Sequence, residues 1–169
     1  NDLAADCELV STIYHVARER SQRDALFISL DANEQCESPG YMIELLHRLR
    51  SDDPAAFDAI LYLEQPVARD LESDRHDMHE LAELKPVILD ESLTRLADID
   101  LALELGWSGI ALKTCKCHTL NLLMLARAEL AGIPYTVQDL TNPGIALLHS
   151  VGLAARTNPL LGVEANARQ

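Results

Sequence analysis

Short, continuously apolar stretches recur along the chain, and the first of them stop at charged residues. The first three end at Asp31, Glu64 and Asp90, and the fourth ends at Lys113. Apolar stretches of this length without alternation are typical of strands buried on both faces, as in parallel sheets. We therefore predict six strands, at residues 25–30, 59–63, 86–89, 109–112, 134–137 and 160–163.

Segments with helical periodicity separate these strands. At the N-terminus Leu3, Val10, Ile13 and Ala17 fall on one broad helical face. Asp53 precedes a proline, a pairing typical of a helix N-cap followed by its first helical residue. We predict helices at residues 2–22, 41–50, 69–84, 93–105, 119–130 and 143–155, of which 69–84 is polar and should expose its charges.

The alternation of strand and helix predicts an α/β protein with a parallel sheet. The first four strand ends lie 33, 26 and 23 residues apart. One strand, loop and helix of a parallel barrel need about 25 to 40 residues, so the spacing suits such a barrel. No Gly-x-Gly-x-x-Gly follows the first predicted strand, so a dinucleotide-binding fold has no support. Polar residues at nearly every strand end favour a barrel over an open sheet, because barrel active sites are built there. The prediction is a partial (β/α)8 TIM barrel of six strands.

Composition and charge restrict the partners. The chain has 169 residues, 48% of them apolar, which suits one domain over residues 1–169. Its formal charge of -13 opposes binding to nucleic acid or to an anionic membrane surface. A small carboxylate could still bind through a metal ion, and the chain could form a homo-oligomer.

The four cysteines are expected to be free thiols in a reducing cytoplasm, because the chain is neither short nor cysteine-dense. The segment 115–118 reads Cys-Lys-Cys-His, which invites a test for zinc. A structural zinc site normally uses two ligand pairs, and the sequence offers no second pair. We therefore do not predict zinc there.

Three acids at consecutive strand ends are candidate ligands for Mg²⁺, or alternatively Mn²⁺. Asp31, Glu64 and Asp90 supply hard oxygen atoms, and a cation would relieve their mutual repulsion. Glu91 is a competing ligand at the third position. For each acid taken alone, a helix cap or a loop hydrogen bond is the simpler interpretation.

Lys113 ends its strand where a fourth acid would be expected, so it is the candidate general base. The alternative is a lysine that only neutralises the acids, and Lys116 is expected to be exposed. His149 lies at helical spacing with apolar residues and is expected to be buried or in an interface. Candidate substrate-binding residues follow the last two strands: Gln138, Asp139, Glu164 and Asn166.

The motifs Leu-Asp-Ala-Asn at 30–33, Leu-Glu-Gln-Pro at 63–66, Leu-Asp-Glu-Ser at 89–92 and Leu-Lys at 112–113 resemble the C-terminal barrel of the enolase superfamily. The resemblance is to the branch of mandelate racemase and muconate lactonising enzyme. It implies that the strands are strands three to eight of the family barrel. It also implies that Asp31, Glu64 and Asp90 hold Mg²⁺ and that Lys113 is an acid/base.

The chain departs from this family in three ways. It has no N-terminal capping domain, it lacks the first two barrel strands, and the segment 113–117 replaces an expected glycine-rich loop. Gln138 and Asp139 stand where a mandelate-type racemase would use a histidine. We therefore expect a fragment of a longer chain.

The resemblance implies an enzyme, an isomerase or lyase, that removes the α-proton of a carboxylate substrate and passes through an enediolate. Racemisation, epimerisation, cycloisomerisation and dehydration remain open. The fragment alone is expected to have little activity, because a partner base would come from the missing region. One alternative is a catalytically incomplete barrel or scaffold that keeps the metal site. Another is an unrelated metal-dependent hydrolase or phosphatase, for which no phosphate loop is present.

Overall fold

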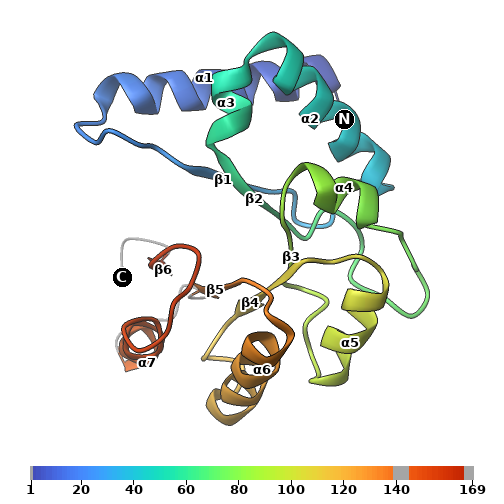
Figure 1. The fold of residues 1–169 in the computed structure, drawn as a ribbon, viewed down its shortest axis with the longest axis vertical. Coiled ribbons are helices and arrows are strands. Elements are labelled where there is room, and N and C mark those ends of the chain that lie inside the picture. The colour runs from blue at the N-terminus through green and yellow to red at the C-terminus, as the bar shows by residue number, and fades with distance from the viewer. Residues whose placement is uncertain (1, 139–144, 166–169) are drawn as a thin grey trace. The chain divides into compact units, whose positions relative to one another are not determined.

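A computed structural model describes residues 2–138 and 145–165. Within these residues strands and helices alternate along the chain, except that α2 and α3 follow one another directly (Figure 1). The strands are β1 (Ile28–Asp31), β2 (Ile60–Glu64), β3 (Val87–Leu89), β4 (Gly109–Leu112), β5 (Tyr135–Gln138) and β6 (Val163–Glu164). The helices are α1 (Leu3–Arg20), α2 (Pro39–Asp52), α3 (Pro54–Ala59), α4 (His79–Leu84), α5 (Ala97–Glu104), α6 (His118–Ala131) and α7 (Ile145–Ala154).

The strands form one sheet in the order of the sequence, β1-β2-β3-β4-β5-β6. Parallel pairing joins β1 to β2, and joins β3, β4, β5 and β6 in succession. Strands β2 to β5 are almost continuously buried, as expected for parallel strands covered on both faces. The predicted α/β class and partial barrel of six parallel strands are therefore confirmed.

Two compact units make up the chain, Asn1–Val87 and Ile88–Gln169. The first contains β1, β2 and helices α1 to α4, and the second contains β4 to β6 and helices α5 to α7. That residues 1–169 form a single domain stays a prediction.

In the first unit, capping residues set where the helices begin. The Asp2 side chain accepts hydrogen bonds from the backbone of α1, from Ala4 N at 3.1 Å and Ala5 N at 3.2 Å. Asp53 caps α3 through Ala56 N at 3.1 Å, with proline at the next position, as predicted. The core is built mainly from α2 and β2, whose buried side chains include Leu45, Leu46, Leu49, Ile60 and Leu63.

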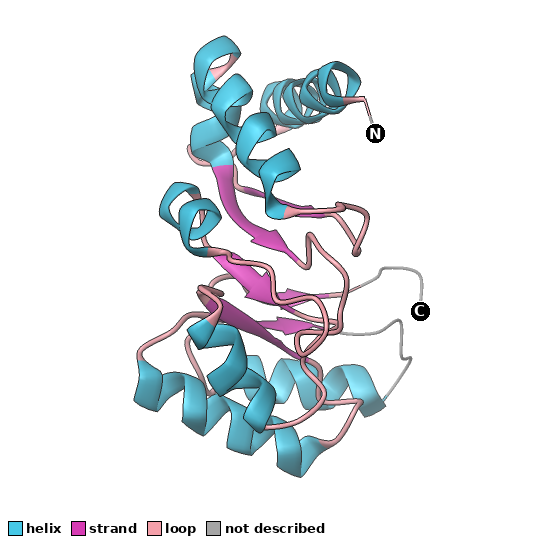
Figure 2. Ribbon diagram, turned by 90° about the vertical axis from the view of Figure 1, so that its right-hand side faces the viewer, coloured by secondary structure: helices cyan, strands magenta, loops and turns pink. Residues whose placement is uncertain are grey.

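In the second unit the helices lie on one side of the strands (Figures 1 and 2). Helix α6 is capped by Gly132, which has a left-handed φ of 68°.

Gly109 is the first residue of β4, and no larger residue fits at this position. A Cβ atom at this position would lie 2.4 Å from Ile88 Cδ1 and 2.7 Å from Pro134 O. Glycine therefore permits β4 to lie close against its neighbours.

Two predicted helices begin later than expected. Of residues 69–84 only His79–Leu84 is helical, because the Asp70 side chain accepts hydrogen bonds from Glu72 N and Ser73 N and holds a turn. Helix α5 begins at Ala97 rather than Leu93, since Asp98 binds the backbone before it. The predicted exposure of the charges between 70 and 80 is confirmed.

None of the helices in the described ranges is long and apolar enough to cross a membrane.

Candidate active site

In the first unit, the strand ends bring two predicted ligands together. Asp31 and Glu64 are paired in register at the ends of β1 and β2. The side chain of Asp31 is exposed, whereas Glu64 is only 4% exposed. Parallel pairing thus places two carboxylates at one edge, as the sequence pattern predicted.

The loops that follow these strands continue side by side. Ala32 N donates to Glu64 O at 3.2 Å, Glu34 N to Gln65 O at 2.8 Å, and Cys36 N to Pro66 O at 2.9 Å. Three residues of these loops have positive φ without being glycine: Asn33 at 45°, Glu34 at 66° and Gln65 at 31°. Such conformations cost energy and persist where the surroundings hold them, often at functional sites.

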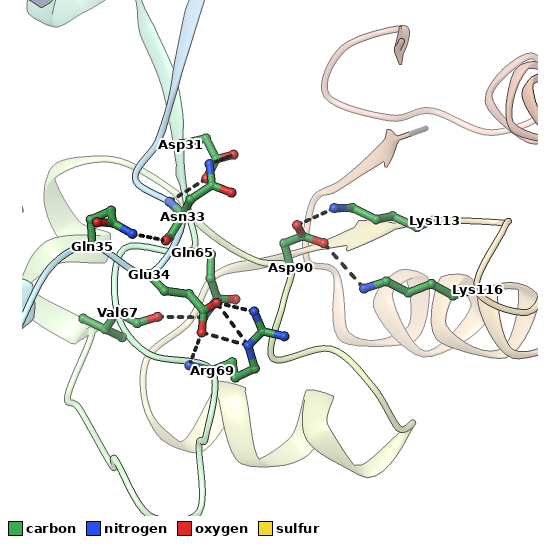
Figure 3. Close-up of polar contacts among 10 residues, drawn as sticks. All are labelled: Asp31, Asn33, Glu34, Gln35, Gln65, Val67, Arg69, Asp90, Lys113 and Lys116. Carbon is green, nitrogen blue, oxygen red and sulfur yellow. Dashed lines mark hydrogen bonds and ion pairs between the residues drawn. The ribbon is translucent and has the colours of Figure 1, made fainter. Parts of the chain in front are cut away.

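Asp31 also makes the local hydrogen bonds of a loop carboxylate. Its Oδ1 accepts from Asn33 N at 2.9 Å, and its Oδ2 accepts from Asn33 Nδ2 at 2.6 Å (Figure 3). The simpler interpretation of this acid, a loop hydrogen bond, therefore holds. It does not exclude a metal, because each carboxylate oxygen can accept more than one partner.

An ion pair ties the two loops of the first unit together. Arg69 donates to Glu34 through its backbone N at 2.8 Å and through Nε at 2.9 and 3.0 Å, and its Nη2 also donates (Figure 3). These hydrogen bonds hold the pKa of Glu34 below its ordinary value. Sequence reasoning missed this pair, since nothing in the pattern links positions 34 and 69.

In the second unit, Asp90 and Lys113 form a buried ion pair (Figure 3). The side chains are 3% and 9% exposed, and Lys113 Nζ donates to Asp90 Oδ2. Lys116 Nζ lies 3.9 Å from Asp90 Oδ1, and its side chain is 40% exposed. Two cations therefore face one buried carboxylate.

The segment that carries both lysines, residues 113–117, is called the lysine loop. Lys116 N donates to Lys113 O at 3.0 Å and closes a turn. The buried Asn121 holds both ends of the loop, because its Nδ2 donates to Lys113 O and Cys117 O, each at 2.9 Å. Asn121 was not singled out in the sequence. An asparagine one turn into a helix gives no signal of this role.

The remaining candidates are partly described. Gln138 and Glu164 are register partners on β5 and β6; Gln138 is buried and Glu164 is exposed. Asp139 and Asn166 lie outside the described residues. His149 is exposed, so burial is wrong, while a place in an interface stays a prediction. Its ring and that of His118 have a centroid distance of 5.4 Å.

The described residues suit Mg²⁺ by donor type. Asp31, Glu64 and Asp90 offer carboxylate oxygens, the ligands that this ion prefers. Within residues 2–138 and 145–165, no three His, Cys, Asp or Glu side chains are gathered as a metal site. Asp90 instead has lysine as its partner.

Three solved structures illustrate the similarity of the fold. The muconate lactonizing enzyme from Pseudomonas fluorescens, complexed with muconolactone, has a TM-score of 0.75 and 24% identity, covering 97% of this chain and 42% of that one. The dipeptide epimerase from Cytophaga hutchinsonii, complexed with Mg and the dipeptide D-Ala-L-Val, has a TM-score of 0.74 and 20% identity, and the match covers 98% of this chain and 42% of that one. A mandelate racemase/muconate lactonizing protein from Herpetosiphon aurantiacus has a TM-score of 0.80 and 19% identity, and the match covers 99% of this chain and 46% of that one.

The chain spans less than half the length of these proteins. No curated protein sequence matches it. The family described as enolase C-terminal domain-like matches residues 2–167, nearly the whole chain. The chain therefore belongs to the enolase C-terminal domain-like family.

Proposed function

We propose that the chain is the barrel part of a Mg²⁺-dependent enzyme that removes the α-proton of a small carboxylate substrate. Family membership supports the class, an isomerase or a lyase. The observation that carries the proposal is the buried pair of Asp90 and Lys113 at neighbouring strand ends. Burial of a lysine costs free energy, so its retention beside a strand end favours a functional role.

In this proposal Asp31, Glu64 and Asp90 hold the metal, with Glu91 as the competing ligand. The metal, when bound, would supply positive charge to offset the negative charge that develops on the substrate carboxylate. Register pairing supports the first two residues as a set. Mg is present in the matched dipeptide epimerase, which is consistent with the choice of ion.

Lys113 Nζ is the proposed acceptor of the α-proton, and it would act as the neutral amine, released from Asp90 when that carboxylate holds the metal. Its side chain is buried and its backbone carbonyl is held by Asn121, which places the base of the side chain at the strand end. A restrained base favours proton transfer, since its position is established before the substrate binds. Lys116 stays beside the same carboxylate and keeps a positive charge near it.

The substrate-orienting residues are proposed to be Gln138, Asp139, Glu164 and Asn166. Gln138 is buried at the end of β5, next in register to Glu164. An amide beside a carboxylate can both donate to and accept from a polar substrate. We also propose a reducing, cytoplasmic location, on the basis of the four free cysteines.

Exchange of the substrate α-proton in D₂O tests this function. The chain, and any longer polypeptide that contains it, would be incubated with Mg²⁺ and either D-Ala-L-Val or muconolactone, the ligands of two matched structures. Loss of the α-proton NMR signal is expected with the longer polypeptide and little loss with the chain alone, and Lys113→Ala in the longer polypeptide should abolish the exchange. Exchange that persists at the same rate in Lys113→Ala would remove this lysine as the base.

A second candidate is a barrel that keeps these residues but binds a partner. Strand β1 alternates between half-buried and exposed residues, unlike β2 to β5. Beside it lies a groove of about 620 Å³ lined by Leu9, Ile13 and Leu30 among others. Mg²⁺ binding without α-proton exchange in the longest polypeptide would favour this alternative.

A further inference from the structure

The lysine loop exposes two thiols that are separated by a single residue. Cys115 and Cys117 are both exposed and lie in the exposed run 115–119. Cys7 and Cys36 are buried instead, and burial raises the pKa of both thiols. The chain thus carries one accessible pair of cysteines and two shielded ones, and the proposed function uses none of them.

The spacing of the two cysteines in the sequence keeps the accessible pair close. Residues i and i+2 can be at most about 7 Å apart between Cα atoms when extended. Cys115 lies inside the turn that Lys116 N closes by donating to Lys113 O at 3.0 Å, Cys117 follows this turn, and Asn121 binds the carbonyls at both ends of the loop. A disulfide needs a Cα separation of about 4.4 to 6.8 Å, so the pair lies within reach of one.

We propose that Cys115 and Cys117 are a reversible redox site that reacts with a low-molecular-weight disulfide. One cysteine thiolate attacks a sulfur of the small disulfide, breaking its S–S bond and expelling one small thiol. The second cysteine then attacks the protein sulfur of this mixed disulfide and expels the other small thiol. The protein pair loses two electrons, the small disulfide gains them, and the two protons pass to the released thiols.

Ring closure would enclose Lys116. This lysine is the only residue between the two cysteines, and its Nζ lies 3.9 Å from Asp90 Oδ1. A disulfide between the two cysteines restrains the backbone of Lys116. Oxidation of the pair therefore affects the position of the Lys116 ammonium beside the buried Asp90 carboxylate. The site therefore links thiol chemistry to the Asp90–Lys113 ion pair, and its existence does not depend on the proposed enzymatic reaction.

The test uses the reduced, folded chain treated with glutathione disulfide. We expect two of the four thiols to disappear from a thiol titration, and the mass of the chain to fall by about 2 Da, the two hydrogens lost. Trypsin cleaves after Lys116, between the two cysteines. Without reductant, the peptides 114–116 and 117–127 should therefore stay linked and separate only when reductant is added.

Matched variants separate this pair from other thiol reactions. Cys115→Ser and Cys117→Ser should each stop at a mixed disulfide that carries one glutathione, and unfolding the untreated chain should expose all four thiols to titration. Four free thiols after treatment would overturn the proposal. So would a stable glutathione adduct on the wild-type chain, or an internal disulfide that still forms in either variant.

Discussion

Replacing Lys113 by methionine would leave the carboxylate of Asp90 buried without its main cation. The two side chains are 9% and 3% exposed, so solvent screens them little. Removing one partner of such a pair typically costs about 3–5 kcal/mol. Lys116 remains 3.9 Å from Asp90 Oδ1 and offsets part of this cost, so we expect a loss near the lower limit, about 3 kcal/mol.

Urea denaturation measures this loss directly. Trp107 is the only tryptophan and is buried in the second unit, so its fluorescence reports unfolding there. With a slope of about 2 kcal/mol per M, the midpoint should fall by roughly 1.5 M. Lys116→Met is the matched control, with an expected loss below about 1 kcal/mol because the Lys116 side chain is 40% exposed.

A second substitution tests the cause. Asp90→Asn in the Lys113→Met background removes the unpaired charge and should recover at least half of the lost stability. The reasoning would be refuted if Lys113→Met were as stable as the wild type, or if Lys116→Met cost as much as Lys113→Met.

Three further predictions concern the surroundings of the site. Gly109→Ala should lower the free energy of unfolding by about 1–3 kcal/mol in a thermal melt, because its Cβ would clash, whereas Gly162→Ala, with open space around it, should have little effect. Glu34→Gln should be less stable than wild type at pH 7, and the difference should shrink in urea titrations as the pH falls below the ordinary pKa of 4.5. Hydrogen bonds from Arg69 lower the Glu34 pKa, so the stabilisation is present above that value and is lost as the pH falls through the folded pKa. Asn121→Ala should cost about 1–3 kcal/mol and speed hydrogen exchange in the lysine loop, because Lys113 O and Cys117 O each lose the side-chain donor and keep only a backbone donor; unchanged exchange would contradict this role.

Much of the fold could be predicted because burial leaves a direct mark on the sequence. Parallel strands buried on both faces favour apolar side chains at nearly every position, so β2 and β4 appear as apolar runs, and β5 is interrupted only by the buried Thr136 before it ends at Gln138. Strand ends could be placed within a few residues, because a charged residue interrupts each of the first four apolar runs, although Glu64, Asp90 and Lys113 are themselves buried. Strand β1 was placed less accurately, at 25–30 rather than Ile28–Asp31, since it is only half buried.

The surroundings of the site could not be predicted, because they depend on contacts between distant residues. Glu34 and Arg69 are far apart in the sequence and meet only when the loops after β1 and β2 run together. The positive φ of Glu34 and Gln65 leaves no glycine signal. Asp70 lies in a segment whose sequence predicts a helix. Its side chain accepts hydrogen bonds from the backbone of Glu72 and Ser73 and holds a turn there instead.

A crystal structure of the chain grown with Mn²⁺ as a stand-in for Mg²⁺, with the ion located by anomalous scattering, tests the central claim most directly. We predict one ion bound by Asp31, Glu64 and Asp90 at about 2.0 to 2.2 Å, with Lys113 Nζ outside its coordination sphere. An ion bound by Glu91 in place of Asp90, or no ion at these three strand ends, would contradict the account.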